Sequence, residues 1–251
     1  MNILIISDIH SNLEALKEVF NYIRINEIEI NRIIVLGDII GYGPFPNETI
    51  NFIKSLKNSE VIAGNHEWGV SNRLNLNYFN ENAKIAIEWT KNMLTSENFN
   101  YIFNLPIELN FEFNNIKYLA VHGSPLNKVE EYIVNNYIAK QSFKALKEDV
   151  GFFGHTHIPY FYKYEGENVL GFYIEDEFEI KIEYSSFKYL INPGSVGQPR
   201  DGDNRVSFGI LNTDSNIFKL KRLEYNFKVT QKYIIDYGLP TFLATRLAWG
   251  R

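Results

Sequence analysis

The sequence contains no cysteine, and this absence narrows the chemistry that the protein can use. Disulfide bonds, catalysis by a thiolate and zinc sites built on sulfur are all excluded. Any metal ion that this chain binds must therefore be held by oxygen and nitrogen atoms.

Long apolar runs and clusters of basic residues are also missing. No segment approaches the roughly 18 consecutive apolar residues of a membrane span, and no signal segment follows Met1. We therefore expect a soluble protein with no membrane partner, and the cytoplasm is its default location. The net charge of −5 argues against a stable nucleic-acid complex. Small phosphorylated substrates remain open, because bound cations can supply the positive charge that the chain lacks.

Histidine is scarce as well, and all five histidines lie in segments that begin as apolar strands. The first segment ends at Asp8 and His10. Because alternate residues of an extended chain point the same way, these two side chains can face one point while Ile9 returns to the core. Four further segments repeat the pattern and end at Asp38, at Asn65-His66-Glu67, at His122 and at His155-Thr156-His157. Chance is a poor explanation for this placement of every histidine.

These segments carry the motifs DxH, GD, GNHE, VHGSP and GHTH in that order. Together they resemble the motifs of the calcineurin-like metallophosphoesterase superfamily. The stretches GDIIGYGPFPNE and NPGSVGQPRDGD resemble a prokaryotic phosphoesterase and phosphodiesterase branch. Since the motifs run from Asp8 to Arg200, the resemblance covers most of the chain.

The order of apolar segments predicts an α/β fold. A helical stripe over residues 13–28 lies between two apolar strands, which is typical of a parallel βαβ unit with ligands beyond the carboxyl ends of the strands. Further helices are predicted at 47–56, 83–94, 138–147 and 242–249. After residue 160, short β-like runs predict a largely antiparallel sheet that faces the first. We expect a single domain over residues 1–251, a four-layer α/β/β/α sandwich of two mixed β-sheets flanked by helices, as the resemblance also implies.

The number of metal-binding side chains is too large for one ion and suits two ions that share a carboxylate. The candidate ligands are Asp8, His10, Asp38, Asn65, His122, His155 and His157. The resemblance implies that Asp8, His10, Asp38 and His157 hold one ion, that Asp38, Asn65, His122 and His155 hold the other, and that Asp38 bridges them. Mixed oxygen and imidazole ligands suit manganese, which we place first, and also iron, zinc, nickel or cobalt.

The expected catalytic residues are Asp38, which serves both ions, and His66. Two ions would bind the phosphate oxygens and lower the pKa of a bridging water, so that hydroxide forms near neutral pH. His66 is spare in the ligand count, and we expect it to protonate the leaving oxygen as a general acid. Glu67 either orients His66 or is a carboxylate at a helix start. Trp68 either stacks on a substrate base or packs in the core.

Four residues are candidates for binding the substrate, namely Asn12, Asn65, His66 and Arg200. Asn12 is either a helix N-cap or an amide aimed at phosphate. The Arg200 guanidinium could bind phosphate through two hydrogen bonds, or it could pair with Asp201 or Asp203 in a plain turn.

These observations favour a dinuclear-metal phosphoesterase that hydrolyses small-molecule or nucleotide phosphodiesters. The loop 41–46 and the aromatic residues near Trp68 and from 78 to 89 predict an enclosed site for such compact ligands. A phosphomonoesterase and an enzyme like the Ser/Thr protein phosphatases are alternatives in the same class. A rival of another class is a non-catalytic metal-binding scaffold, but such a protein should have lost ligands or His66. The physiological substrate and the oligomeric state, including a homo-oligomer, stay open.

Overall fold

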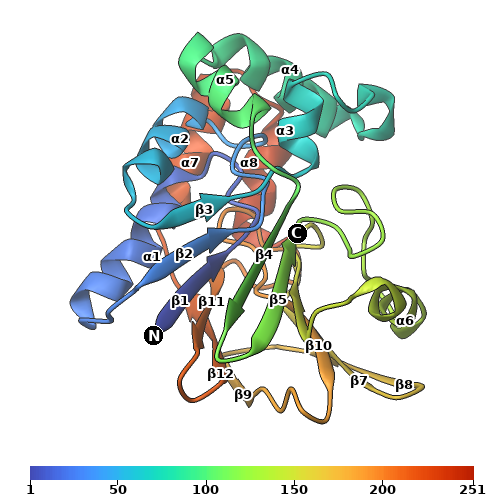
Figure 1. Ribbon diagram of the computed structural model, residues 1–251. Helices are drawn as coiled ribbons and strands as arrows, with labels where there is room; N and C mark the ends of the chain where they lie inside the picture. The colour runs from blue at the N-terminus through green and yellow to red at the C-terminus, as the bar shows by residue number, and fades with distance from the viewer.

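The computed structural model describes residues 1–251 and contains two six-stranded β-sheets that face each other (Figure 1). Across the first sheet the strands are β3 (Ser59–Val61), β2 (Arg32–Val35), β1 (Asn2–Ile6), β11 (Val206–Asn212), β12 (Ile217–Leu223) and β9 (Phe178–Lys181). Across the second they are β4 (Glu108–Phe113), β5 (Ile116–Val121), β6 (Val150–Phe152), β10 (Lys188–Asn192), β7 (Tyr160–Glu165) and β8 (Asn168–Tyr173). Both sheets mix parallel and antiparallel pairs.

Strand β1 is buried on both faces, which explains its unbroken apolar sequence. Ile3 and Ile5 point into the apolar layer between the two sheets, where they join side chains such as Phe152. Leu4 and Ile6 point the other way and pack in the cluster beneath the helices. The two-residue period of an extended chain thus connects two separate cores through one strand.

Helices cover both outer faces of the sheet pair. Helices α1 (Leu13–Ile25) and α2 (Pro46–Ser55) pack on the first sheet, and α6 (Asn136–Ala145) packs on the second through Ala139 and Phe143. Together with the sheets they form the expected four-layer α/β/β/α sandwich, so the prediction of the fold is confirmed. None of the helices is both long enough and apolar enough to cross a bilayer.

The remaining helices are α3 (Asn65–Val70), α4 (Glu81–Met93), α5 (Ser96–Phe103), α7 (Phe227–Asp236) and α8 (Thr241–Trp249), with a short 3₁₀ helix at Leu76–Tyr78. Figure 1 shows α3, α4 and α5 grouped at the end of the sheets toward which β1 and β2 run. Several helices begin at an asparagine whose side-chain oxygen accepts a backbone N–H, as at Asn80 and Asn135. The many asparagines of this chain thus serve partly as helix caps.

The expectation that the second half of the chain forms the facing sheet is correct only for β7, β8 and β10. Strands β9, β11 and β12 belong to the first sheet, because β11 pairs antiparallel with β1. Strands β4, β5 and β6, from the middle of the chain, belong to the second sheet. Helices α5 and α7 were also not predicted. Their apolar faces are short, and tertiary packing decides such segments more than local sequence does.

Candidate metal centre

Six of the predicted ligands lie in loops at the carboxyl ends of β1, β2, β5 and β6, and the seventh, Asn65, begins helix α3 after β3. Five of them have a left-handed backbone with φ between 49° and 65°, namely Asp8, His10, Asp38, His155 and His157. This conformation costs a residue other than glycine of order 1–3 kcal/mol, and such strain gathers at functional sites. The expectation that Asp8 and His10 converge on an extended strand is therefore wrong, since β1 ends at Ile6 and tight turns bring them together.

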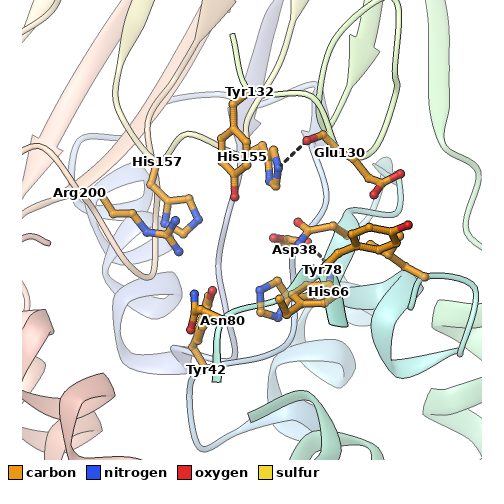
Figure 2. A pocket seen from close by; sticks show the side chains of 13 residues that line it. Asp38, Tyr42, His66, Tyr78, Asn80, Glu130, Tyr132, His155, His157 and Arg200 are labelled. Carbon is orange, nitrogen blue, oxygen red and sulfur yellow. Dashed lines mark hydrogen bonds between the residues drawn. The ribbon is translucent and has the colours of Figure 1, made fainter. Parts of the chain in front are cut away.

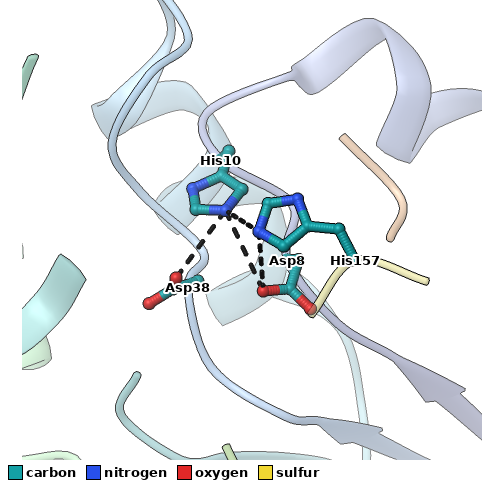
Figure 3. A group of neighbouring side chains, drawn as sticks. All are labelled: Asp8, His10, Asp38 and His157. Carbon is teal, nitrogen blue, oxygen red and sulfur yellow. Dashed lines mark hydrogen bonds and ion pairs between the residues drawn. The ribbon is translucent and has the colours of Figure 1, made fainter. Parts of the chain in front are cut away.

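One group of side chains consists of Asp8, His10, Asp38 and His157 (Figure 3). The Nε2 atom of His157 lies 3.3 Å from Oδ1 of Asp8 and 3.1 Å from Nε2 of His10. The same His10 nitrogen lies 3.6 Å from Oδ2 of Asp38. All four residues are buried, so their ligand atoms converge in a region without competing solvent.

The second group consists of Asp38, His122 and His155, with the amide of Asn65 beside them. The Nε2 atom of His122 lies 3.3 Å from Oδ2 of Asp38, 3.1 Å from Oδ1 of Asn65 and 3.1 Å from Nδ1 of His155. Oδ2 of Asp38 thus faces both groups. The structure brings all seven predicted ligands together in the two sets that the resemblance implied.

Each histidine of the two groups uses its outer ring nitrogen to donate to a backbone carbonyl. Nδ1 of His10 donates to Ile40 (3.1 Å), Nδ1 of His122 to Leu36 (2.8 Å), Nδ1 of His157 to Gln198 (2.5 Å) and Nε2 of His155 to Glu130 (3.2 Å). A neutral imidazole carries one N–H, so in a neutral ring the inner nitrogen presents a lone pair. Such bonds fix the tautomer of histidines that bind metals.

The ring nitrogens and carboxylate oxygens that face each other inside the two groups are better suited to binding a cation than to contacting one another. In their neutral forms, His10 and His157 point lone pairs at each other across 3.1 Å, which is repulsive unless a positive charge lies between them. Oδ1 of Asp8 is buried and makes no hydrogen bond within the protein, and such an orphaned carboxylate oxygen is costly. The donor set of carboxylate, amide and imidazole therefore suits two divalent transition-metal ions.

Electrostatics keep most of these rings neutral. Burial lowers the pKa of His10, His155 and His157 well below the usual range. Burial also opposes protonation of His122, but the adjacent Asp38 outweighs it and raises the pKa of His122 to about 9. A divalent cation must therefore compete with a proton at His122, whereas the other three imidazoles are ready to bind.

The metal groups form the floor of a cavity of about 130 Å³. Figure 2 shows His66 on one side and Arg200 on another, and both side chains line the cavity. Nδ1 of His66 is buried against Gly41 and makes no hydrogen bond. A side chain at Gly41 would place its Cβ 2.1 Å from this nitrogen, so glycine is required there. Burial, against the attraction of Asp38, lowers the pKa of His66 to about 4.

Glu67 does not reach the His66 ring. Its carboxylate accepts three backbone N–H bonds, from Gly64 (2.7 Å), Asp38 (2.9 Å) and Ile40 (3.2 Å). The carboxylate thus caps its own helix α3 and ties that helix to the loop that carries Asp38. Of the two interpretations of Glu67, the carboxylate at a helix start matches these contacts. The same contacts hold the segment of Asn65 next to the loop of Asp38.

Arg200 has no acidic partner. Asp201 pairs with Arg222 and Asp203 pairs with Arg205, so neither of the predicted turn pairs forms. The Arg200 guanidinium donates to Oε1 of Gln198 at 2.9 Å, and its Nε is buried without a partner. The Arg200 side chain lines the cavity, so its remaining N–H groups are available to a ligand there.

Asn12 and Trp68 are engaged elsewhere. The Asn12 amide donates to the Gly197 carbonyl (2.8 Å) and to the Tyr225 hydroxyl (2.9 Å), and its oxygen accepts from Thr230 and from the start of α1. The Asn12 amide thus bonds to groups within the protein, so Asn12 is not part of the proposed substrate site. Trp68 packs against the core beneath the helices and does not line the cavity.

Two tyrosines at the site were not predicted. The Tyr42 ring packs between His10 and His66, with centroid distances of 4.7 and 4.4 Å. Tyr132 stacks on His155 at 3.7 Å and lines the cavity. Tyr42 lies in the loop 41–46 that the sequence predicts to enclose the site, although it is not among the predicted site residues. Tyr132 lies in an irregular connector without a pattern.

The fold and the paired Asp and His groups define an α/β protein with a buried site suited to two metal ions. A family model described as the calcineurin-like phosphoesterase superfamily domain matches residues 1–216. An uncharacterized protein of Methanocaldococcus jannaschii is 39% identical over 250 residues, which cover 99% of this chain and 98% of the relative. The chain belongs to the calcineurin-like phosphoesterase superfamily, which confirms the resemblance seen in the sequence.

Solved structures agree with this assignment. A metallophosphoesterase from Sphaerobacter thermophilus is 38% identical with a TM-score of 0.85, and the match covers 100% of this chain and 99% of that one. A hypothetical protein from Pyrococcus horikoshii, 20% identical, has the same fold with a TM-score of 0.81 over 100% of this chain and 98% of that one. Membership in this family implies that the protein is a metal-dependent hydrolase of phosphoesters.

Proposed function

We propose that this protein hydrolyses phosphate esters of small molecules, with phosphodiesters preferred, and that it uses two divalent metal ions, manganese first. The observation that carries the proposal is the convergence of seven donor side chains in two groups that share the Asp38 carboxylate. Membership in the calcineurin-like phosphoesterase superfamily supports the same reaction class.

The ions, when bound, supply the positive charge that polarises a phosphate and lowers the pKa of water. The chain itself supplies the geometry. Asp38 holds the two groups together, because Oδ1 accepts from the His66 backbone N–H at 2.9 Å while Oδ2 faces His10 and His122. Asn65 and Arg200 border the cavity and offer N–H donors to phosphate groups of the substrate.

His66 is the proposed proton donor. In the free protein its low pKa keeps the ring neutral, but a phosphate bound in the cavity brings negative charge beside it and favours the protonated form. The ring has no protein partner at Nδ1 that would hold it in one role. Its position at the cavity wall suits delivery of a proton to a departing oxygen.

The cavity favours compact substrates. At about 130 Å³ it is smaller than the roughly 300–1,000 Å³ of pockets that enclose a drug-sized ligand, so it holds a phosphoryl group and little more. Leu74, Tyr78, Phe79 and Tyr132 form its apolar walls. The exposed rings of Tyr78 and Tyr132 suit a base or aryl group that extends out of the cavity better than they suit an extended phosphopeptide.

The preference for small diesters is testable by comparing substrates. We expect kcat/KM for bis-p-nitrophenyl phosphate to exceed that for p-nitrophenyl phosphate and for a phosphoserine peptide, all with manganese. The acidic chain, with a net charge of −5, repels a negatively charged phosphoprotein at low salt. A peptide preferred by tenfold, or about 1.4 kcal/mol of transition-state binding, would overturn the small-molecule assignment.

A further inference from the structure

A second arginine, Arg246 on the C-terminal helix α8, shares a neighbouring ring with Arg200. The guanidinium carbon of Arg246 is 5.8 Å from the ring centroid of Tyr42, and that of Arg200 is 5.6 Å from the same centroid. Tyr42 itself packs against α8 through Leu243 and Leu247. The Tyr42 ring, which touches His10 and His66 at the site, is therefore the common neighbour of both cations.

The segment that carries Arg200 is tied to the end of α8. The Gly202 N–H donates to the Gly250 carbonyl at 2.8 Å, and the Asn204 amide donates to the Ala248 carbonyl at 3.3 Å. A side chain at Gly250 would place its Cβ 2.4 Å from the carbonyl oxygen of Asp203, so the contact is close. These bonds connect the elements that present the two guanidinium groups.

Neither arginine pairs with the side chain of an aspartate or a glutamate. The two acidic residues that follow Arg200 are engaged by other arginines, and Arg246 bonds only through Nε to the carbonyl of Arg251. Glu130 also lines the cavity, but Figure 2 shows it on the side opposite Arg200. Burial and the charge of Arg200 lower the pKa of Arg246 to about 10, so the cation is kept at a cost that an anion would remove.

We propose that Arg200 and Arg246 form a subsite for a second phosphate of the substrate, one that is not cleaved. This inference rests on the proposed function, because it requires the scissile phosphate to lie over the metal groups. The small cavity leaves the rest of such a substrate outside. Arg200 and Tyr42 line the cavity, and Arg246 is the neighbour of Tyr42 on α8. Arg246 lies beyond the residues 1–216 that the family model matches.

The test compares two chromogenic esters that differ by one phosphate. Thymidine 5′-(p-nitrophenyl phosphate) and its 3′-phosphorylated counterpart would be assayed with manganese-loaded protein. Arg246→Gln should lower kcat/KM for the 3′-phosphorylated ester by about tenfold to a hundredfold, the range expected when hydrogen bonds to a charged group are lost. The loss on the other ester should be much smaller. Arg246→Lys should be intermediate, because it keeps the charge but not the planar fork.

Arg24→Gln on the exposed end of α1 is the matched control for removing one positive charge, and it should leave the ratio of the two rates as in the wild type. A second readout does not need hydrolysis. Thymidine 3′,5′-bisphosphate should raise the melting temperature of the wild type more than thymidine 5′-monophosphate does, and Arg246→Gln should remove the difference.

Equal losses on the two esters, or none on either, would overturn the subsite. So would a melting temperature that rises equally with both nucleotides in the wild type. If neither ester is hydrolysed while the difference in melting temperature persists, the proposed function fails and the anion subsite stands.

Discussion

Replacing Asp38 by asparagine is expected to lower kcat/KM by more than about a hundredfold, the upper range for losing a residue that only supports a metal ligand. Asp38 faces both groups of ligands, so its charge contributes to both ion positions. Asparagine keeps the volume and one acceptor oxygen, but it removes the charge and directs an NH₂ group at the lone pairs of His10 and His122. Elemental analysis of the purified variant should show loss of metal.

The matched control for this variant is Asp236→Asn, since Asp236 lies at the exposed end of α7 and pairs only with Lys232. It should retain the activity and metal content of the wild type. Circular dichroism should first show that the Asp38→Asn protein is folded. If that protein then carries a full complement of metal and hydrolyses the substrate at the normal rate, the bridging role of Asp38 is refuted.

Replacing His66 by glutamine is expected to leave the metal content unchanged and to slow hydrolysis in a way that depends on the leaving group. For an alkyl or nucleoside leaving group, whose alkoxide is strongly basic, the loss should reach about 10²–10⁴-fold, the usual contribution of a general acid. For p-nitrophenolate, which departs without a proton, the loss should be small. The aryl ester therefore acts as an internal control on the same variant.

The outcome also distinguishes the other roles that the structure permits for His66. Equal losses across leaving groups would mean that the ring binds phosphate and does not deliver a proton. Loss of a metal ion from His66→Gln would make His66 a ligand and would change the assignment of the two groups. The measurement matters because Glu67, which could have oriented the ring, instead binds three backbone N–H groups.

Much of the site follows from local sequence because each ligand comes directly after an apolar strand. Such strands must be buried, and parallel strands end at one edge, so Asp8, Asp38 and His122 are brought together by the sheets that they leave. The backbone conformation that brings the ligand side chains together could not be predicted from the pattern of apolar strands. The left-handed turns at Asp8 and His10 are strained, and local propensity argues against them.

Other features depend on contacts between distant segments. The pairing of β11 with β1 decides which sheet receives the end of the chain, and no spacing within either strand reveals its partner. Tyr132 meets His155 through a connector without regular structure, and Arg246 meets Tyr42 only because α8 packs on the loop after β2. The residues that shape the rim of the cavity are therefore less predictable than the ligands on its floor.

The central claim is that this chain cleaves phosphate esters through a site for two metal ions. The most direct test is a titration of metal-free protein, verified by elemental analysis, with manganese while the hydrolysis of bis-p-nitrophenyl phosphate is followed. We expect no hydrolysis before metal is added and a rate that reaches its plateau as about two equivalents bind, as for other two-metal hydrolytic sites. Undiminished hydrolysis by the metal-free protein would contradict the account.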